Sequence, residues 1–243
     1  MRRRFFVEQF NGTTAVVEGG TAHHLGHVLR AQAGQLYELS DGSAAWLARI
    51  ESVARNRVEF ALLEQLPAPR PAADITLLLA VVKFDAFEWA IEKATELGVT
   101  TIIPLAGARS EKGLLAAASK RSERWQKILL ESSQQSRRLR LPQLDDLAKP
   151  AQAFAAQTAE FRVMLSERSD APSLRNILEH SNHTKAPANA SLAIGPEGGW
   201  TDDELIAARA SGFQEASLGQ LILRTETAVI ASLSMLSYAL SPT

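Results

Sequence analysis

The sequence predicts an α/β protein in two parts: a small β-barrel, followed by a parallel sheet with helices on both faces. Residues 67–73 hold three prolines, which cannot lie inside a helix or a central strand, so we expect a linker there. Before this linker the apolar runs are short and β-like. After it they alternate between strand and helix periodicity. We therefore place the domains at residues 1–69 and 74–243.

The first part contains a strong hairpin signal. Residues 35–40 and 44–50 flank Asp41-Gly42, a dipeptide typical of tight turns between antiparallel strands. Residues 14–18 form another β-like run, and a short helix is expected from about Thr21 to Arg30. These elements predict the small barrel.

The second part alternates strands and helices. Residues 75–82 form a continuous apolar run, as in a strand that is buried on both faces. Helical spacing follows from Phe87 to Leu97, and Gly98 is placed to end that helix. Further strands are expected at 101–105, 161–165, 191–194 and 215–218, and further helices at 122–135, 173–180, 202–210 and 226–240. This alternation predicts the parallel sheet.

Composition excludes several classes of protein. The 243 residues include no cysteine, which excludes a disulfide scaffold, a thiolate metal site and a cysteine nucleophile. The basic start of the chain lacks the apolar core of a signal peptide, and no apolar run reaches the roughly 18 residues that span a bilayer. We expect a cytoplasmic protein with no membrane partner.

The net charge of −1 does not indicate a nucleic-acid binder, but charge is locally concentrated. Arg2, Arg3 and Arg4 form one basic cluster, and residues 137–140 hold three more arginines. Each cluster is either an RNA contact or ordinary solvated surface.

A glycine-rich loop lies between an expected strand and an expected helix. It reads Gly195-Pro-Glu-Gly-Gly199. Thr201 and Glu204 have the spacing of a capping box, and Trp200 with Leu205 has that of a hydrophobic staple. The helix therefore has a well-defined start.

This loop is not a phosphate-binding loop, because no Lys-Ser/Thr pair follows the glycines. Asp202 and Asp203 already occupy the positive end of the helix and would repel phosphate. A ligand that presents a base, a ribose or a cation suits the loop better. The alternative is a tight structural turn.

The second informative segment, residues 218–227, joins the last expected strand to a helix that is apolar almost all round. Such a helix is buried, in a core or in a subunit interface. We expect the cluster Arg224-Thr225-Glu226-Thr227 at its start to be buried and to need partners. These are either a ligand or an internal cap with an Arg–Glu pair.

Together these segments resemble the RsmE-type 16S ribosomal RNA uridine-N3 methyltransferases of the SPOUT superfamily. The resemblance covers nearly the whole chain. It includes Arg3-Arg4-Phe5-Phe6, His23-His24-Leu25, Ser40-Asp41-Gly42, Lys83, Glu88-Trp89, residues 93–99, Arg124-Trp125, Gln135-Ser136, Arg138 and Pro142. Leu221 and Ala86 depart from the arginine and lysine that are frequent at these positions in the family, so we give neither position a role.

The resemblance implies the fold and the reaction. The first domain would be a PUA-like barrel that binds RNA, and the second an α/β methyltransferase domain with a C-terminal trefoil knot. The protein would be a homodimer that transfers a methyl group from S-adenosylmethionine to N3 of a uridine in 16S rRNA of the small ribosomal subunit.

The resemblance also implies site residues. Those expected to bind the cofactor are Leu165, Ile194, Gly195, Glu197, Gly198, Gly199, Leu218, Gly219, Ile222, Leu223, Arg224 and Thr227. Candidates for handling the uracil proton or its negative charge are Arg224, Glu226, Arg138 and Arg4. Expected RNA contacts are Arg2, Arg3, Arg4, His24, Arg30 and Lys83. A branched side chain at Gly199 is expected to displace the adenosine and leave the fold intact.

Two other functions compete with this one. A non-catalytic RNA-binding protein with a degenerate methyltransferase domain would keep the basic clusters, but it would have no reason to keep both the glycine loop and the 218–227 segment. A nucleotide-using α/β enzyme conflicts with Asp202 and Asp203. His23, His24 and His27 have no carboxylate or cysteine to complete a metal site, and we expect none.

Overall fold

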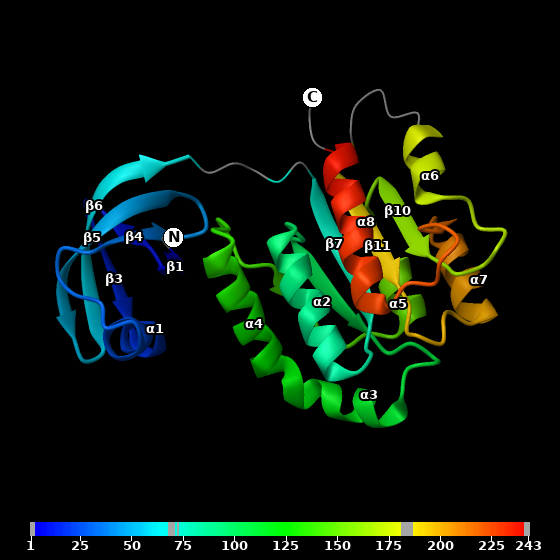
Figure 1. Ribbon diagram of the computed structural model, residues 1–243, viewed down its shortest axis with the longest axis horizontal. Coiled ribbons are helices and arrows are strands. Elements are labelled where there is room, and N and C mark those ends of the chain that lie inside the picture. Colours follow the sequence, from blue (N-terminus) through cyan, green and yellow to red (C-terminus); the bar gives the residue numbers. More distant parts are fainter. Residues whose placement is uncertain (1–2, 68–70, 72, 181–186, 241–243) are drawn as a thin grey trace. The chain divides into compact units, whose positions relative to one another are not determined.

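The computed structural model describes residues 3–67, 71, 73–180 and 187–240. They form two compact units, Met1–Arg70 with Leu130–Leu141 and Pro71–Leu129 with Pro142–Thr243 (Figure 1). The expected linker lies largely outside the described residues. The chain also passes between the units on either side of Leu130–Leu141, a return that no sequence pattern indicated.

The first unit is a curled six-stranded sheet in the order β1-β4-β5-β6-β3-β2 (Figure 1). Its strands pair antiparallel, except that β1 is parallel to β4. The elements are β1 (Arg4–Phe6), β2 (Phe10–Asn11), β3 (Thr14–Glu18), α1 (Gly19–His23), the π-helical turn η1 (His24–Val28), β4 (Leu36–Ser40), β5 (Ala45–Ala54) and β6 (Arg57–Leu66).

The predicted hairpin is confirmed, since Ser40 lies opposite Ala45 in the β4–β5 ladder. β6 was not predicted. It forms a second hairpin with β5, which continues to Ala54 and not only to Ile50 as the sequence run indicated. The short helix begins at Gly19 and not at Thr21, and its second half is a π-turn. The core of this unit includes Phe5 and Phe60.

The second unit contains an entirely parallel sheet in the order β12-β10-β11-β7-β8-β9. The predicted parallel sheet is therefore confirmed. The elements are β7 (Asp74–Ala80), α2 (Phe84–Glu96), β8 (Thr101–Leu105), α3 (Lys112–Ala118), the 3₁₀ turn η2 (Ser119–Arg121), α4 (Ser122–Gln135), β9 (Gln143–Leu144), α5 (Pro150–Ala155), β10 (Phe161–Leu165), α6 (Leu174–His180), β11 (Asn189–Ile194), α7 (Asp202–Ala210), β12 (Gln214–Ala216) and α8 (Thr225–Leu240).

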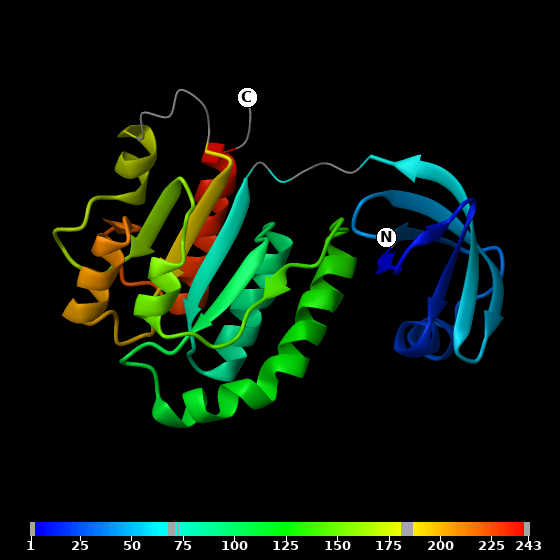
Figure 2. The same ribbon diagram turned by 180° about the vertical axis from the view of Figure 1, so that it is seen from behind.

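Side-chain alternation along the central strands divides the core into two layers. Leu77 and Leu79 of β7 face α2 and α8, whereas Leu78 and Ala80 face α5 and α7. Figure 1 shows α2 and α8 against one face of the sheet, and Figure 2 shows α5 and α7 against the other. Burial on both faces explains why the β7 sequence is apolar without alternation.

The sequence expectations for this unit hold closely. β8, β10, α4 and α7 have the predicted bounds residue for residue. The helices α3 and α5 and the short strand β9 were not predicted. Pro150, the first residue of α5, was a usable signal because proline is favoured at that helical position.

The capping box at the start of α7 is confirmed, because Thr201 Oγ1 accepts from the Glu204 amide and the Glu204 carboxylate accepts from the Thr201 amide. Just before it, the indole of Trp200 lies against Gly195. A Cβ atom at Gly195 would be 3.0 Å from Trp200 Cε2. Trp200 Nε1 donates to the carbonyl of Leu165 at 2.9 Å, so the indole joins the ends of β10 and β11.

We predict that Gly195→Ala lowers the free energy of unfolding by about 1–3 kcal/mol, because the buried Trp200 has no room to move away from a methyl group. Urea unfolding followed by tryptophan fluorescence measures this change. Gly113→Ala is the matched control, since its Cβ meets only a carboxylate oxygen at 3.9 Å. Equal stability of the two variants would contradict the packing argument.

Candidate functional site

The carboxyl ends of three neighbouring strands carry the segments that were predicted to line a cofactor pocket. β10 lies between β12 and β11, and all three run parallel, so the chain after Leu165, Ile194 and Ala216 emerges at one edge of the sheet. Open α/β sheets bind their ligands at this edge. The topology thus brings together segments that are about 20 to 30 residues apart in sequence.

A hydrogen bond joins the glycine loop to the start of the final helix. Thr225 Oγ1, at the first residue of α8, lies 3.4 Å from the carbonyl oxygen of Gly195. Leu218 and Leu223 are half-buried against the same core layer as Ile194. The two segments that the sequence singled out therefore form one continuous surface.

The loop after β8 also contacts the glycine loop, which the sequence did not indicate. Arg109 Nη1 donates to the carbonyl of Gly198 at 2.7 Å, and the Ala108 amide donates to Glu204 Oε1 at 2.8 Å. Glu204 therefore caps α7 with one carboxylate oxygen and holds the neighbouring loop with the other.

These contacts correct the interpretation of the glycines. At Gly195 and Gly198 an added Cβ would meet the protein's own Trp200 and Arg109 side chains, so close approach to a ligand is not needed to explain either glycine. Gly199 has a φ of +70°, which side-chain-bearing residues rarely adopt. A branched residue at Gly199 would therefore strain the loop as well as meet the expected adenosine site.

The surface around the start of α7 is acidic. Glu197 of the glycine loop and Asp202 and Asp203 of the first helical turn are all exposed. The positive end of α7 is already satisfied by its capping box and by these carboxylates. Arg168 lies 3.9 Å from Asp202 and Arg109 contacts the loop, so these carboxylates are partly balanced; phosphate is disfavoured because the positive end of α7 is already satisfied.

The expected buried cluster at the start of α8 is wrong for most of its members. Only Thr225 is buried, whereas Arg224 and Thr227 are exposed and Glu226 is half-buried. Among the described residues, Arg224 and Glu226 form no ion pair, so the internal pair considered from sequence is not present. Arg224 is thus a free cation at the sheet edge.

Two apolar side chains of the same segment are exposed to an unusual degree. Leu221 and Ile222 have exposed fractions of 81% and 76%. Gly219, at φ +133°, lets the chain turn outward just before them. Ile222, a predicted cofactor contact, therefore points away from the core of its own chain.

The candidate arginines of the first unit differ sharply in exposure. Arg4 is buried, donates twice to Glu38 Oε2, and donates to the carbonyl of Arg137 at 2.7 Å. It is therefore corrected from an RNA contact or catalytic candidate to a structural residue. Arg138 is half-buried, and burial lowers its pKa to about 10, so it remains a cation at neutral pH.

The remaining predicted RNA contacts are accessible to different extents. Arg3, Arg30 and Lys83 are exposed, and His24 is half-buried. Arg2 lies outside the described residues. Lys83 immediately precedes α2 in the second unit, whereas the other three belong to the first unit.

The predicted histidine helix places two rings together. His23 and His27 stack with their centroids 4.4 Å apart. Within the part of the chain that the structure describes, no group of three His, Cys, Asp or Glu residues is placed to hold a metal ion. Nor does any helix in that part have the length and apolar character to cross a bilayer.

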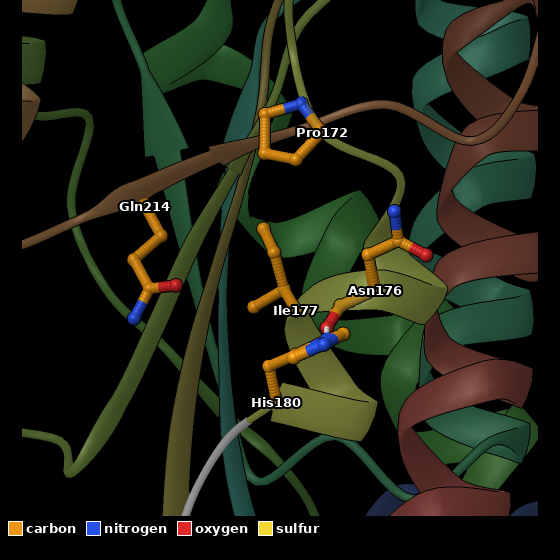
Figure 3. Close-up of a pocket in the computed structure, with 5 residues that line it drawn as sticks. All are labelled: Pro172, Asn176, Ile177, His180 and Gln214. Atoms are coloured by element: carbon orange, nitrogen blue, oxygen red, sulfur yellow. Dashed lines mark hydrogen bonds between the residues drawn. The ribbon is translucent and has the colours of Figure 1, made fainter.

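A hollow of about 310 Å³ lies elsewhere, beside the edge strand β12 (Figure 3). Gln214, the first residue of β12, and Asn176, Ile177 and His180 of α6 line it together with Pro172. None of these residues belongs to the predicted cofactor segments. The mixture of polar and apolar side chains that line this hollow indicates no specific ligand or reaction. The surface at the strand ends therefore remains the candidate site.

Comparison with known proteins gives a consistent result. The chain matches the RNA methyltransferase domain family over residues 69–237 and the RNA methyltransferase PUA domain family over residues 17–63. It is 35% identical to the ribosomal RNA small subunit methyltransferase E of Synechocystis over 95% of this chain and 75% of the relative. The Bacillus subtilis enzyme of the same name is 30% identical over 97% and 96% of the two chains.

Solved structures agree over nearly the full length. Ribosomal RNA small subunit methyltransferase E from Neisseria gonorrhoeae, bound to S-adenosyl methionine, has a TM-score of 0.86, 28% identity and 98% coverage of both chains. A methyltransferase from Legionella pneumophila with bound SAM has the same TM-score and coverage at 27% identity. From its two matched domains and its full-length relatives, the chain belongs to the ribosomal RNA small subunit methyltransferase E family of RNA methyltransferases.

Proposed function

We propose that this protein transfers a methyl group from S-adenosylmethionine to N3 of a uridine in 16S rRNA. The observation that carries this proposal is the contact between Thr225 and Gly195, which joins the two motif segments at the ligand-binding edge of the sheet. The same edge belongs to a chain that superposes over 98% of its length on enzymes crystallised with SAM.

The donor groups at this edge fit a sulfonium cofactor. Its positive charge is suited to a surface bearing Glu197, Asp202 and Asp203, and its adenosine carries no phosphate that these carboxylates would repel. When bound, the sulfonium supplies an activated methyl group. We assign the cofactor contacts to Leu165, Ile194, Gly195, Glu197, Gly198, Gly199, Leu218, Gly219, Ile222, Leu223, Arg224 and Thr227.

Two of these residues can contact the cofactor through main-chain carbonyl groups that already accept one hydrogen bond. The Leu165 carbonyl already accepts from Trp200, and the Gly198 carbonyl from Arg109. Carbonyl oxygens accept up to two hydrogen bonds, so each retains one lone pair for a ribose hydroxyl or an adenine amine. Ile222, exposed and apolar, offers the adenine ring a surface to pack against.

The acceptor nitrogen of uracil carries a proton at neutral pH, and some group must take it or stabilise the anion. Arg224 is exposed and unpaired among the described residues, so its guanidinium is available to the uracil oxygens. Glu226, half-buried two residues later, is the candidate base. Arg138 is the second cation that we propose for the developing charge, because its lowered pKa still leaves it protonated.

The reactive imide lies on the base-pairing edge, so the target uridine must be unpaired or flipped out. We propose that the first domain, residues 1–69, holds the surrounding RNA through Arg3, His24 and Arg30. Lys83 of the methyltransferase domain, residues 74–243, is a further phosphate contact. The cytoplasm, where small ribosomal subunits are assembled, is the expected location.

The final helix supports a homodimer. α8 buries one face, including Leu233 and Leu236, and exposes Met235 at 43% and Tyr238 at 89%. Leu236 is fully buried in its own chain and is therefore not available to a partner. We propose that Tyr238, Met235 and the exposed Leu221 contact a second copy of the chain across a two-fold axis.

We also propose that the chain between β11 and α8 forms the trefoil knot of the superfamily.

For catalysis, we predict that Arg224→Ala lowers kcat for 16S rRNA by about 100-fold to 1000-fold, the typical loss for a group that stabilises developing negative charge. Transfer of the labelled methyl group from S-adenosylmethionine to 16S rRNA measures the rate. Mass spectrometry of the digested RNA then identifies the methylated base. Arg209→Ala, which removes another exposed arginine of the same unit, should have the wild-type rate.

Calorimetry with S-adenosylmethionine separates this function from its alternative. A wild-type protein that binds 16S rRNA but not the cofactor would be the non-catalytic RNA-binding protein considered above. Methylation at a carbon or a ribose hydroxyl would retain the enzyme class but contradict the uridine-N3 assignment.

For assembly, we predict that Tyr238→Asp converts the dimer to monomer at micromolar concentration and removes methyl transfer, because a carboxylate would be desolvated in the interface. Sedimentation velocity measures the change. Leu63→Asp is the control, since Leu63 is an exposed apolar residue of the first unit, at 47%. A wild-type protein that is monomeric and active would disprove the dimer.

A further inference from the structure

A short arginine-rich segment is fastened to the sheet of the first unit by side chains far away in sequence. We call residues 136–141, which follow α4, the arginine loop. The loop belongs to the first unit together with the last residues of α4, although the chain before Leu130 belongs to the second unit. It contains Arg137, Arg138 and Arg140. Nothing in the sequence pattern alone links it to the N-terminal strands.

Buried charge makes the first attachment. Arg4 Nη1 donates to the Arg137 carbonyl at 2.7 Å, while its Nε and Nη2 atoms donate to Glu38 Oε2 at 3.2 and 3.0 Å. The other Glu38 oxygen lies 3.4 Å from Arg137 Nη1. Glu38 is 7% exposed and therefore bridges two arginines across β1, β4 and the loop.

Two further hydrogen bonds to main-chain carbonyl oxygens complete the attachment of the arginine loop to the sheet. The buried Ser40 hydroxyl donates to the carbonyl of Leu139 at 2.8 Å. Arg140 Nε donates to the carbonyl of Gly42 in the β4–β5 turn. Arg138 Nε in turn donates to the carbonyl of Arg140 at 3.1 Å. The loop is thus fixed at residues 137, 139 and 140.

The backbone at Arg137 is unusual for an arginine. The Arg138 amide donates to the carbonyl of Ser133, which is the hydrogen bond of a Schellman motif, and Arg137 takes the left-handed position with φ +57°. Glycine is the usual residue there because other residues are strained. Arg137 therefore occupies a backbone position that favours glycine, and this turn directs the chain after α4 back along the strands.

The attachment leaves positive charge on the surface. Arg137 has a side-chain exposure of 42%, and Arg140 is exposed, although both side chains also help to hold the loop. Two guanidinium groups fixed a few residues apart on a rigid backbone suit the phosphates of a nucleic acid strand. Because rotamer freedom is already lost, less entropy is lost when phosphate binds.

We propose that Glu38, Arg4 and Ser40 are positioning residues that hold the arginine loop so that Arg137 and Arg140 contact the phosphate backbone of the RNA substrate. This inference rests on the proposed function, because it requires an RNA substrate. It assigns Arg4 an indirect role in RNA binding, and it assigns Glu38, a carboxylate, a role that strengthens binding of a polyanion.

The direction in which replacement of Glu38 changes RNA affinity distinguishes this proposal from a simple effect of charge. Removing a carboxylate that merely lies near the RNA should strengthen binding, because less negative charge opposes the phosphates. Removing Glu38 as a positioning residue should weaken binding, because the arginine loop is released. Glu51→Gln is the matched control, since Glu51 of β5 also pairs with an arginine of the same sheet but is itself exposed.

The experiment measures binding of the full-length protein to a 16S rRNA transcript over a series of salt concentrations. We expect Arg140→Gln to weaken binding about threefold to tenfold and to reduce the salt slope by about 1, as for one lost phosphate contact. Glu38→Gln and Ser40→Ala should raise KM for RNA and leave S-adenosylmethionine affinity unchanged; kcat should fall as well, because release of the loop also displaces Arg138. Glu51→Gln should bind as tightly as wild type or slightly more tightly.

Limited trypsin digestion tests release of the loop directly. Cleavage after residues 137, 138 and 140 should increase in Glu38→Gln and Ser40→Ala but not in Glu51→Gln. If Glu38→Gln does not fold, Ser40→Ala carries the test, since it leaves no buried charge unpaired. Faster cleavage of the loop with unchanged RNA affinity would overturn the proposal, as would tighter binding by Glu38→Gln. A wild-type protein that fails to bind 16S rRNA would instead overturn the proposed function.

Discussion

The packing of Trp200 on Gly195 determines the geometry of the candidate site. The indole occupies the space where any other residue at position 195 would have its Cβ, and its ring nitrogen holds the Leu165 carbonyl. The ends of β10 and β11 are thereby fixed relative to the start of α7. Glu204 then extends this arrangement to the loop after β8 through the Ala108 amide. A ligand at the strand ends would find a prearranged surface, which reduces the entropy lost on binding.

Burial separates the arginines of this chain into two functional groups. Arg4 is enclosed with Glu38 and organises the protein itself, whereas Arg224 and Arg140 carry charge to the surface. A buried guanidinium needs a partner for nearly every donor, so its position is well determined and its charge is neutralised locally. An exposed guanidinium keeps its charge available for RNA or for a developing anion. Arginine therefore stabilises the fold where it is buried and is available to a ligand or to RNA where it is exposed.

The last segment of the chain has two proposed tasks, cofactor binding and dimer formation. Residues 218–227 supply predicted cofactor contacts, and the same stretch exposes Leu221 and Ile222. Apolar side chains this exposed are unfavourable in water unless a ligand or a partner covers them. Under the proposed function, the cofactor would cover part of this surface and a second copy of the chain would cover the rest. Assembly and cofactor binding would then depend on each other.

The sequence by itself determined the parallel sheet, most helices of the second unit, the capped start of α7 and the family. These follow from local periodicity, from short-range caps and from motifs in a specific order, all of which can be read along the chain. Only the tertiary structure showed which side chains are accessible to a ligand or to RNA and which are buried in the fold. The sequence could not show that Arg4 is buried, that Gly195 and Gly198 accommodate Trp200 and Arg109, or that the arginine loop packs with strands more than 90 residues earlier. Burial and long-range hydrogen bonds depend on contacts between distant segments, and no local pattern encodes them.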